Sequence, residues 1–140
     1  ARGTKPLAQI ADLLACVHPL VPKEREKKDL AKVFQALRIE VNHELEALER
    51  AVPVAIDSLS LGGRFVAMSY HSLEDKIVKR GLSAAATSKA PKGFPVELDE
   101  HKPTMKVITR GAEPPTEAEI AENSRAASAK LRAGEKIRVT

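Results

Sequence analysis

The pattern of apolar and polar positions predicts an α/β protein whose N-terminal stretch is helical. Apolar residues at helical spacing predict a first helix over residues 6–17. The charged stretch 22–28 alternates in sign, which indicates a solvated link. From Asp29 onward apolar side chains recur every three or four residues over residues 30–52. This pattern predicts one long helix that Pro53 ends or divides.

The periodicity then changes from helical to strand-like. Residues 64–70 form a nearly continuous apolar run after a glycine turn, which is typical of a strand buried on both faces. Residues 71–80 return to a helical period, and Ser72 and Asp75 have the spacing of a helix cap. Residues 83–103 are small, polar and proline-rich, so we expect a long surface loop there.

Two further strands are predicted near the C-terminus. Residues 105–110 and 128–139 have strand character, and a short helix lies between them. Thr116 and Glu119 have the spacing of a capping box at the start of that helix. The elements therefore predict half of an α/β sheet.

Composition limits the class of protein. The 140 residues are 43% hydrophobic with a net charge of +4, which suits one folded domain rather than a disordered chain. Cys16 is the only cysteine, which excludes an intrachain disulfide and a cysteine-based zinc site. No apolar run could span a bilayer, and no secretory signal opens the sequence, so we expect no membrane partner and a cytoplasmic location. The absence of an initiator methionine suggests a piece of a longer protein.

Candidate chemistry is sparse. The sequence has no glycine-rich dinucleotide motif, no phosphate-binding loop and no histidines at metal-ligand spacing, so we predict no metal site. Residues 101–140 carry eight basic and five acidic side chains, which permits an acidic partner such as RNA. His71 follows a predicted strand, where ligands of open α/β sheets bind, but a structural hydrogen bond explains it equally well. A polar stripe on the long helix borders a cleft or is simply a solvated edge.

Four segments resemble one known family. They are residues 34–42 (FQALRIEVN), 69–80 (SYHSLEDKIVKR), 108–110 (ITR) and 121–132 (AENSRAASAKLR). In this order they are similar to the RsmH (MraW) family of bacterial 16S rRNA cytosine-N4 methyltransferases. The resemblance extends from about Leu7 to Ile137.

The resemblance implies a transferase that uses S-adenosylmethionine to methylate the exocyclic amine of a cytosine in 16S rRNA of the small ribosomal subunit. It implies the C-terminal half of a class I, Rossmann-like methyltransferase sheet. Residues 1–30 would end a helical insertion, and residues 31–140 would belong to the catalytic domain. The strand at 64–70 would lie parallel to its neighbours, and the last two strands would form an antiparallel edge.

The family's cofactor-binding segments have no counterpart in this sequence. We therefore expect S-adenosylmethionine to be bound mainly by a missing N-terminal half, which would be a partner of this chain, and the chain alone to be inactive. A homodimer or a strand swap is a further expectation. Two alternatives stay open, namely a non-catalytic RNA- or ribosome-binding module and a structural fragment that folds only against its missing half.

The resemblance raises ten polar residues to candidates for cleft or RNA-facing positions, with no catalytic base assigned among them. They lie on the long helix, at the end of the first strand and around the last strand: Gln35, Arg38, Asn42, Tyr70, His71, Ser72, Asp75, Asn123, Arg125 and Arg132.

Overall fold

The computed structural model describes residues 6–91, 93 and 98–139, and the chain divides into two compact units, Ala1–Glu44 and Leu45–Thr140. The first unit is helical, with α1 (Ile10–Val17), short 3₁₀ turns at His18–Leu20 and Lys23–Arg25, and α2 (Glu26–Asn42). None of its helices has a buried residue. The predicted boundary after residue 30 falls inside α2, and the assignment of residues 1–30 to an insertion stays a prediction.

Two expectations for this unit were wrong in their boundaries. The first helix begins at Ile10 rather than at residue 6, because the Asp12 carboxylate accepts hydrogen bonds from the Ala8 and Gln9 N–H groups at 3.1 and 3.0 Å. The supposed link at 22–28 is helical for much of its length. Its charges pair one turn apart, with Arg25 at 3.5 Å from Asp29, and such pairs stabilise a helix.

The predicted long helix is two helices. α2 ends at Asn42, His43 adopts a left-handed conformation with φ of 50°, and α3 (Glu44–Asp57) follows. One left-handed residue ends a helix without disturbing the apolar periodicity, so the sequence pattern runs through the break. Pro53 neither ends nor divides α3 but lies inside it. Its ring is on an exposed part of the helix, where water can solvate the carbonyl that loses its N–H partner.

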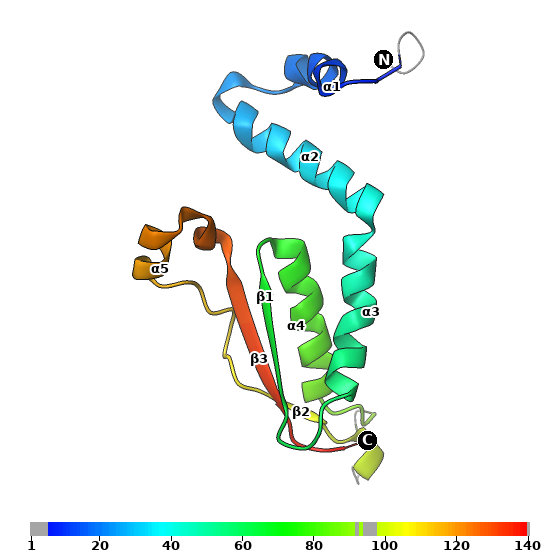
Figure 1. Ribbon diagram of the computed structural model, residues 1–140. Helices are drawn as coiled ribbons and strands as arrows, with labels where there is room; N and C mark the ends of the chain where they lie inside the picture. Colours follow the sequence, from blue (N-terminus) through cyan, green and yellow to red (C-terminus); the bar gives the residue numbers. More distant parts are fainter. Residues whose placement is uncertain (1–5, 92, 94–97, 140) are drawn as a thin grey trace. The chain divides into compact units, whose positions relative to one another are not determined.

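The second unit contains a three-stranded sheet in the order β1-β3-β2, built from β1 (Arg64–Ser69), β3 (Lys130–Lys136) and β2 (Met105–Val107) (Figure 1). Both pairings are antiparallel, as the register Arg64↔Glu135 and Met105↔Lys136 illustrates. The antiparallel pairing of the last two strands is confirmed. The expectation that the strand at 64–70 has parallel neighbours was wrong within the described sheet, because β3 returns between β1 and β2.

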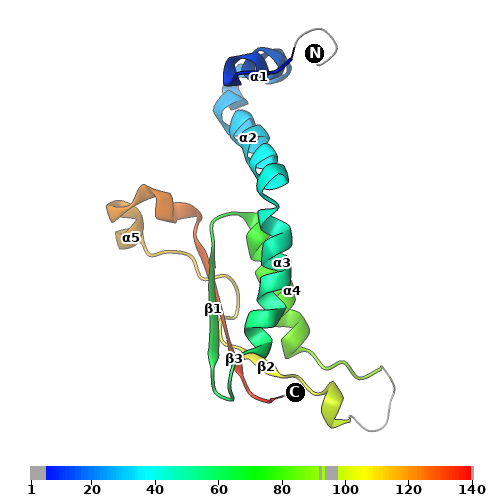
Figure 2. The same cartoon turned by 45° about the vertical axis from the view of Figure 1, so that its right-hand side comes forward.

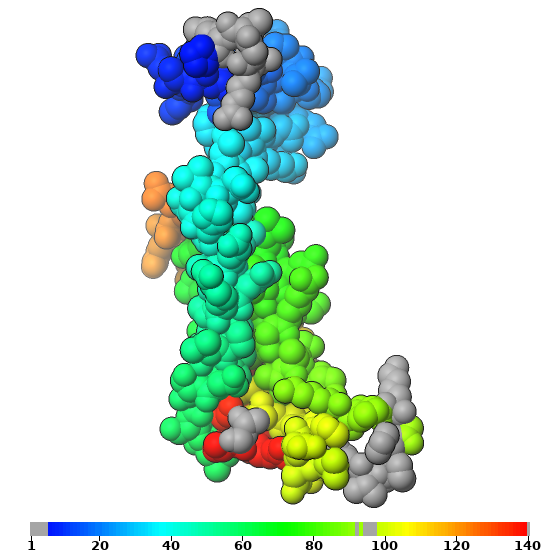
Figure 3. All heavy atoms as spheres, turned by 90° about the vertical axis from the view of Figure 1, so that its right-hand side faces the viewer, coloured from blue at the N-terminus to red at the C-terminus, as the bar shows by residue number. Residues whose placement is uncertain are grey.

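α3 and α4 (Ser72–Ala86) cover one face of this sheet (Figures 1 and 2). Val52 and Ile56 of α3 pack with Val78 and Leu82 of α4 and with Met105 of β2, and all five are at most 3% exposed. Figure 3 shows the two helices in contact side by side. This cluster is the hydrophobic core of the second unit.

The other face of β1 is exposed. Val66 and Met68 are 58% and 59% exposed, whereas Phe65 and Ala67 turn toward the helices. The edge of β1 away from β3 pairs with no strand in the described residues. The predicted burial of this strand on both faces is therefore wrong for the chain by itself.

The C-terminal elements follow the predicted order. α4 continues to Ala86, so the expected loop begins later, and a 3₁₀ turn at Asp99–His101 interrupts it; residues 92 and 94–97 of that loop lie outside the described residues. α5 (Glu117–Glu122) begins with the predicted capping box, in which Thr116 and Glu119 bond each other's backbone N–H groups. A 3₁₀ turn at Ser124–Ser128 then leads into β3.

Candidate functional site

Two strand ends meet at one end of the sheet. β1 and β3 are antiparallel and Ser69 pairs with Lys130, so the carboxyl end of β1 and the amino end of β3 lie at the same end. The shorter β2 ends opposite Gly134, farther along β3. The N-terminus of α4 follows the carboxyl end of β1 directly. Candidate residues from two distant segments, 70–75 and 130–132, are therefore brought together, which makes this end of the sheet the candidate site.

The turn between β1 and α4 is held by Glu74. Its Oε2 accepts hydrogen bonds from the N–H groups of Tyr70 at 3.0 Å and His71 at 3.3 Å. Ser69 before the turn is buried, while Tyr70 is 56% exposed. This arrangement presents the Tyr70 ring to solvent at the end of the strand.

His71 caps α4. Its Nδ1 accepts a hydrogen bond from the Glu74 N–H at 3.4 Å, which places the proton of a neutral imidazole on Nε2. Nε2 is buried and lies 3.1 Å from Glu74 Oε1 without the geometry of a hydrogen bond. The expected cap of Ser72 and Asp75 was wrong, because the helix begins one residue earlier and Ser72 is its exposed first residue.

Asp75 and Arg132 form the strongest polar contact of the site. Arg132 donates from Nε to Asp75 Oδ1 at 2.7 Å and from Nη2 to Oδ2 at 3.1 Å, and the side chains of Arg132 and Asp75 are only 14% and 13% exposed. Lys130 Nζ approaches the same carboxylate at 3.9 Å. A bidentate ion pair between two largely buried side chains fixes the orientation of the Arg132 guanidinium plane.

The charges around Asp75 stabilise its ionised form. The hydrogen bond from Arg132 lowers the pKa of Asp75 most, and the positive charges of Arg132, Lys130 and Lys79 act in the same direction against the opposing effect of burial. Asp75 is therefore a fixed anion near neutral pH and not a proton acceptor poised for catalysis. Its chemical role is to hold Arg132.

The five remaining candidates lie in other segments of the chain. Gln35, Arg38 and Asn42 lie on α2 in the first unit, where Arg38 donates to Glu44 Oε1 from Nε at 3.1 Å and Nη2 at 2.9 Å. Asn123 caps the 3₁₀ turn before β3 by accepting from the Arg125 N–H at 3.1 Å, and the Arg125 side chain is exposed. A cleft or RNA-facing role for these residues stays a prediction.

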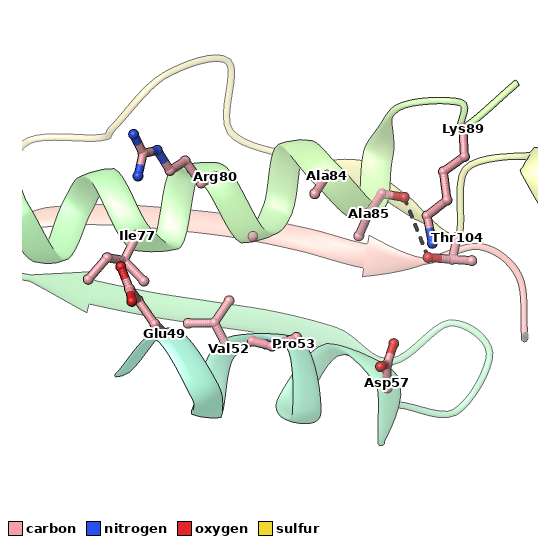
Figure 4. Close-up of a pocket in the computed structure, with 11 residues that line it drawn as sticks. Glu49, Val52, Pro53, Asp57, Ile77, Arg80, Ala84, Ala85, Lys89 and Thr104 are labelled. Atoms are coloured by element: carbon pink, nitrogen blue, oxygen red, sulfur yellow. Dashed lines mark hydrogen bonds between the residues drawn. The ribbon is translucent and has the colours of Figure 1, made fainter. Parts of the chain in front are cut away.

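A separate hollow lies between α3 and α4. It has a volume of about 410 Å³, and Figure 4 shows Glu49, Val52 and Asp57 on one side with Arg80 and Lys89 on the other. Thr104 donates to the Ala85 carbonyl at 3.4 Å at one end. None of the ten predicted residues lines this hollow.

Sequence reasoning missed Glu74 and Lys130. Glu74 stands three residues after His71, which is the spacing of a capping box, and the motif was overlooked because histidine is an uncommon cap. Lys130 has alternate spacing with Arg132 on β3, so both side chains fall on one face of the strand. That alternation was a usable signal.

The described residues offer little for other kinds of site. Among residues 6–91, 93 and 98–139, no three His, Cys, Asp or Glu side chains gather as metal ligands. No helix in the same ranges has the length and apolar character that crossing a membrane requires.

Comparison with known proteins identifies the family. The model of the MraW methylase family matches residues 1–137. The chain is 57% identical to ribosomal RNA small subunit methyltransferase H of Pseudarthrobacter chlorophenolicus over 99% of this chain and 43% of the relative. It is 58% identical to the protein of the same name from Renibacterium salmoninarum, again over 99% and 43%, and 54% identical to that of Kocuria rhizophila over 100% and 44%.

The chain thus spans less than half the length of these relatives. The family match nevertheless includes the whole candidate site, from Tyr70 through Arg132. The chain belongs to the MraW methylase family.

Proposed function

We propose that this chain supplies the RNA-holding part of an S-adenosylmethionine-dependent methyltransferase that modifies the exocyclic amine of a cytosine in 16S rRNA of the small ribosomal subunit. The observation that carries the proposal is the Asp75–Arg132 pair beside Tyr70 and His71, at the end of β1, inside a segment matched by a methylase family. The names of the relatives support an RNA substrate.

The residues of this chain do not fit a complete site for the methyl donor. Such a site needs a glycine-containing turn that lets backbone approach the cofactor and an acidic side chain for its ribose hydroxyls. The turn after β1 is Tyr70-His71-Ser72, without glycine, and the one buried carboxylate there is occupied by Arg132. We therefore assign cofactor binding to residues outside this chain and derive no step through it.

The exposed face and unpaired edge of β1 also support the assignment of cofactor binding to residues outside this chain. An unpaired strand edge together with exposed Val66 and Met68 is an unfinished sheet surface, which soluble domains normally cover. An N-terminal half that continues the sheet from the β1 edge would cover it. The alternative that the chain is a purely structural fragment rests on the same exposed surface. The methylation assay of His71→Asn, described below, distinguishes that alternative from the proposed function.

The chemistry of the reaction indicates what the site must provide. The lone pair of the cytosine amine is delocalised into the ring, so the base must be held in line for methyl transfer and taken out of its stack. Side chains that hold phosphates and base edges supply that positioning. Arg132 and the exposed Tyr70 are the groups of this chain suited to it, and the imidazole of His71 follows Tyr70 directly.

The test is a conservative substitution of His71 in the full-length enzyme, which spans the whole length of the relatives. His71→Asn keeps an oxygen that can cap α4 but removes the imidazole. We expect methylation of small-subunit rRNA to fall at least about tenfold, within the range for a lost positioning or proton-transfer group, while the melting temperature stays close to that of wild type. The matched control is the same change at the exposed His43, whose left-handed conformation asparagine tolerates, and this variant should keep its activity. Normal turnover by His71→Asn would remove His71 from the site.

A further inference from the structure

A second polar feature lies beside the candidate site, between α4 and the chain that leaves β2. It is a hollow of about 320 Å³, called here the basic hollow. No carboxylate is among the residues that line it. Its polar lining consists of three cationic and three hydroxyl side chains: Lys79, Arg110, Arg132, Ser83, Thr87 and Thr109.

The positive charge of the basic hollow is only partly neutralised by the protein around it. Asp75 is the carboxylate that faces this group, and its two oxygens are bonded by Arg132, whose Nη1 remains outside that pair. Lys79 and Arg110 are exposed and form no ion pair with any residue that the structure describes. A concave, cation-lined surface with one shared counter-charge attracts anions.

The cations continue around α4. An adjoining hollow shares Lys79, Ser83 and Thr87 with the first and adds Lys76 and Arg80. Lys76, Lys79 and Arg80 stand three and four residues apart, a spacing at which like charges weaken a helix. Asp75, four residues before Lys79, offsets this repulsion for Lys79. However, Lys76 and Arg80 have no acidic residue at helical spacing in α4. An anion laid along the helix would compensate the remaining repulsion.

We propose that the basic hollow and its extension along α4 bind successive backbone phosphates of single-stranded RNA, with Lys79 and Arg110 as the principal contacts. The inference rests on the proposed function in taking RNA as the substrate. Arg132 belongs both to the basic hollow and to the candidate site, so a strand held here lies directly beside the end of β1. Cations spread over two adjoining hollows suit a chain of phosphates better than one free nucleotide.

The experiment measures RNA binding by the 140-residue chain. Fluorescein-labelled single-stranded RNA is titrated by fluorescence anisotropy at several salt concentrations for wild type and for Lys79→Ala/Arg110→Ala. The matched control is Arg50→Ala/Lys106→Ala, which removes two exposed cations that line neither hollow. We expect Lys79→Ala/Arg110→Ala to bind RNA about tenfold more weakly, and the magnitude of its slope of log K against log salt to fall by about 1 to 2. In the control variant both the affinity and the slope should change much less.

Equal weakening in both double variants would overturn the proposal, because it would mean diffuse attraction by net charge. Unchanged binding in the first variant, or no salt-dependent RNA binding by wild type, would overturn it as well. A methyl-transfer assay on the full-length enzyme separates this result from the proposed function. A raised KM for rRNA with preserved kcat in Lys79→Ala/Arg110→Ala supports the basic hollow, whereas a wild-type enzyme that binds RNA here but methylates none would contradict the proposed function alone.

Discussion

Gly81 sets how closely α3 and α4 pack, and replacing it tests the core of the second unit. A β-carbon at this position would collide with Cγ1 of Val52, which is 3% exposed and belongs to the buried cluster. Alanine in a helix interior is favoured over glycine by about 1 kcal/mol, while overpacking of a rigid core costs about 1 to 3 kcal/mol or more. Because the contact is far inside van der Waals distance and Val52 is β-branched, we expect Gly81→Ala to lose about 2 kcal/mol of unfolding free energy.

The second substitution, Val52→Ala, makes this prediction specific. It removes the colliding methyl group and leaves Val52 Cβ, which lies at 3.5 Å from the added carbon, an ordinary contact. Alone it should cost about 2 kcal/mol for the lost burial and the cavity. Additive effects would then total about 4 kcal/mol, but the methyl group introduced by Gly81→Ala fills the vacated space, so we expect the double variant to lose only about 1 to 2 kcal/mol.

Urea unfolding followed by far-ultraviolet circular dichroism measures all four proteins of this cycle. The slope of unfolding free energy against urea should be the same in each, so that midpoints report stability alone. Additive losses within about 0.5 kcal/mol, or a Gly81→Ala chain more stable than wild type, would refute the close approach of the two helices.

Three further predictions concern single sites. Asp75→Asn should lower the unfolding free energy by about 3 kcal/mol at neutral pH, because it leaves the largely buried Arg132 with a neutral partner. The midpoint of urea unfolding measures this loss, and an unchanged midpoint would contradict it. The pKa of Asp75 is lowered in the folded chain, so ionised Asp75 stabilises the fold fully above the unfolded pKa of about 3.9. This stabilisation is lost as the pH falls through the pKa of the folded chain. The difference in unfolding free energy between wild type and Asp75→Asn should therefore disappear only in acid. Gly134→Ala should destabilise by about 1 to 3 kcal/mol, because its β-carbon would meet Leu82 Cδ2 at 2.8 Å and Met105 Cε at 3.1 Å; a melting temperature at or above that of wild type would disprove this contact.

Local sequence signals predicted the elements well and their ends less well. The Thr116–Glu119 capping box and the strands near 105 and 130 depend on neighbouring residues, and the structure has them. The break at His43 depends on the conformation of one residue, which apolar periodicity does not register. The position of β3 between β1 and β2 depends on pairing across a long separation, which no local pattern encodes.

The candidate site shows the same distinction. The family resemblance made Asp75 and Arg132 candidates, but their pairing joins residues 57 positions apart and appears only when β3 returns beside β1. The basic hollow likewise combines α4 with residues 107–110 and Arg132. Its cations could be counted in the sequence, whereas their convergence depends on the fold.

The most direct test of the proposed function is nucleoside mass spectrometry of small-subunit rRNA after incubation with S-adenosylmethionine and the enzyme at the full length of its relatives. We predict one new methyl group on the exocyclic nitrogen of a 16S rRNA cytosine. The same incubation with the 140-residue chain alone should add none. Methylation of a different base, no methylation by the full-length enzyme, or methylation by this chain alone would contradict the account.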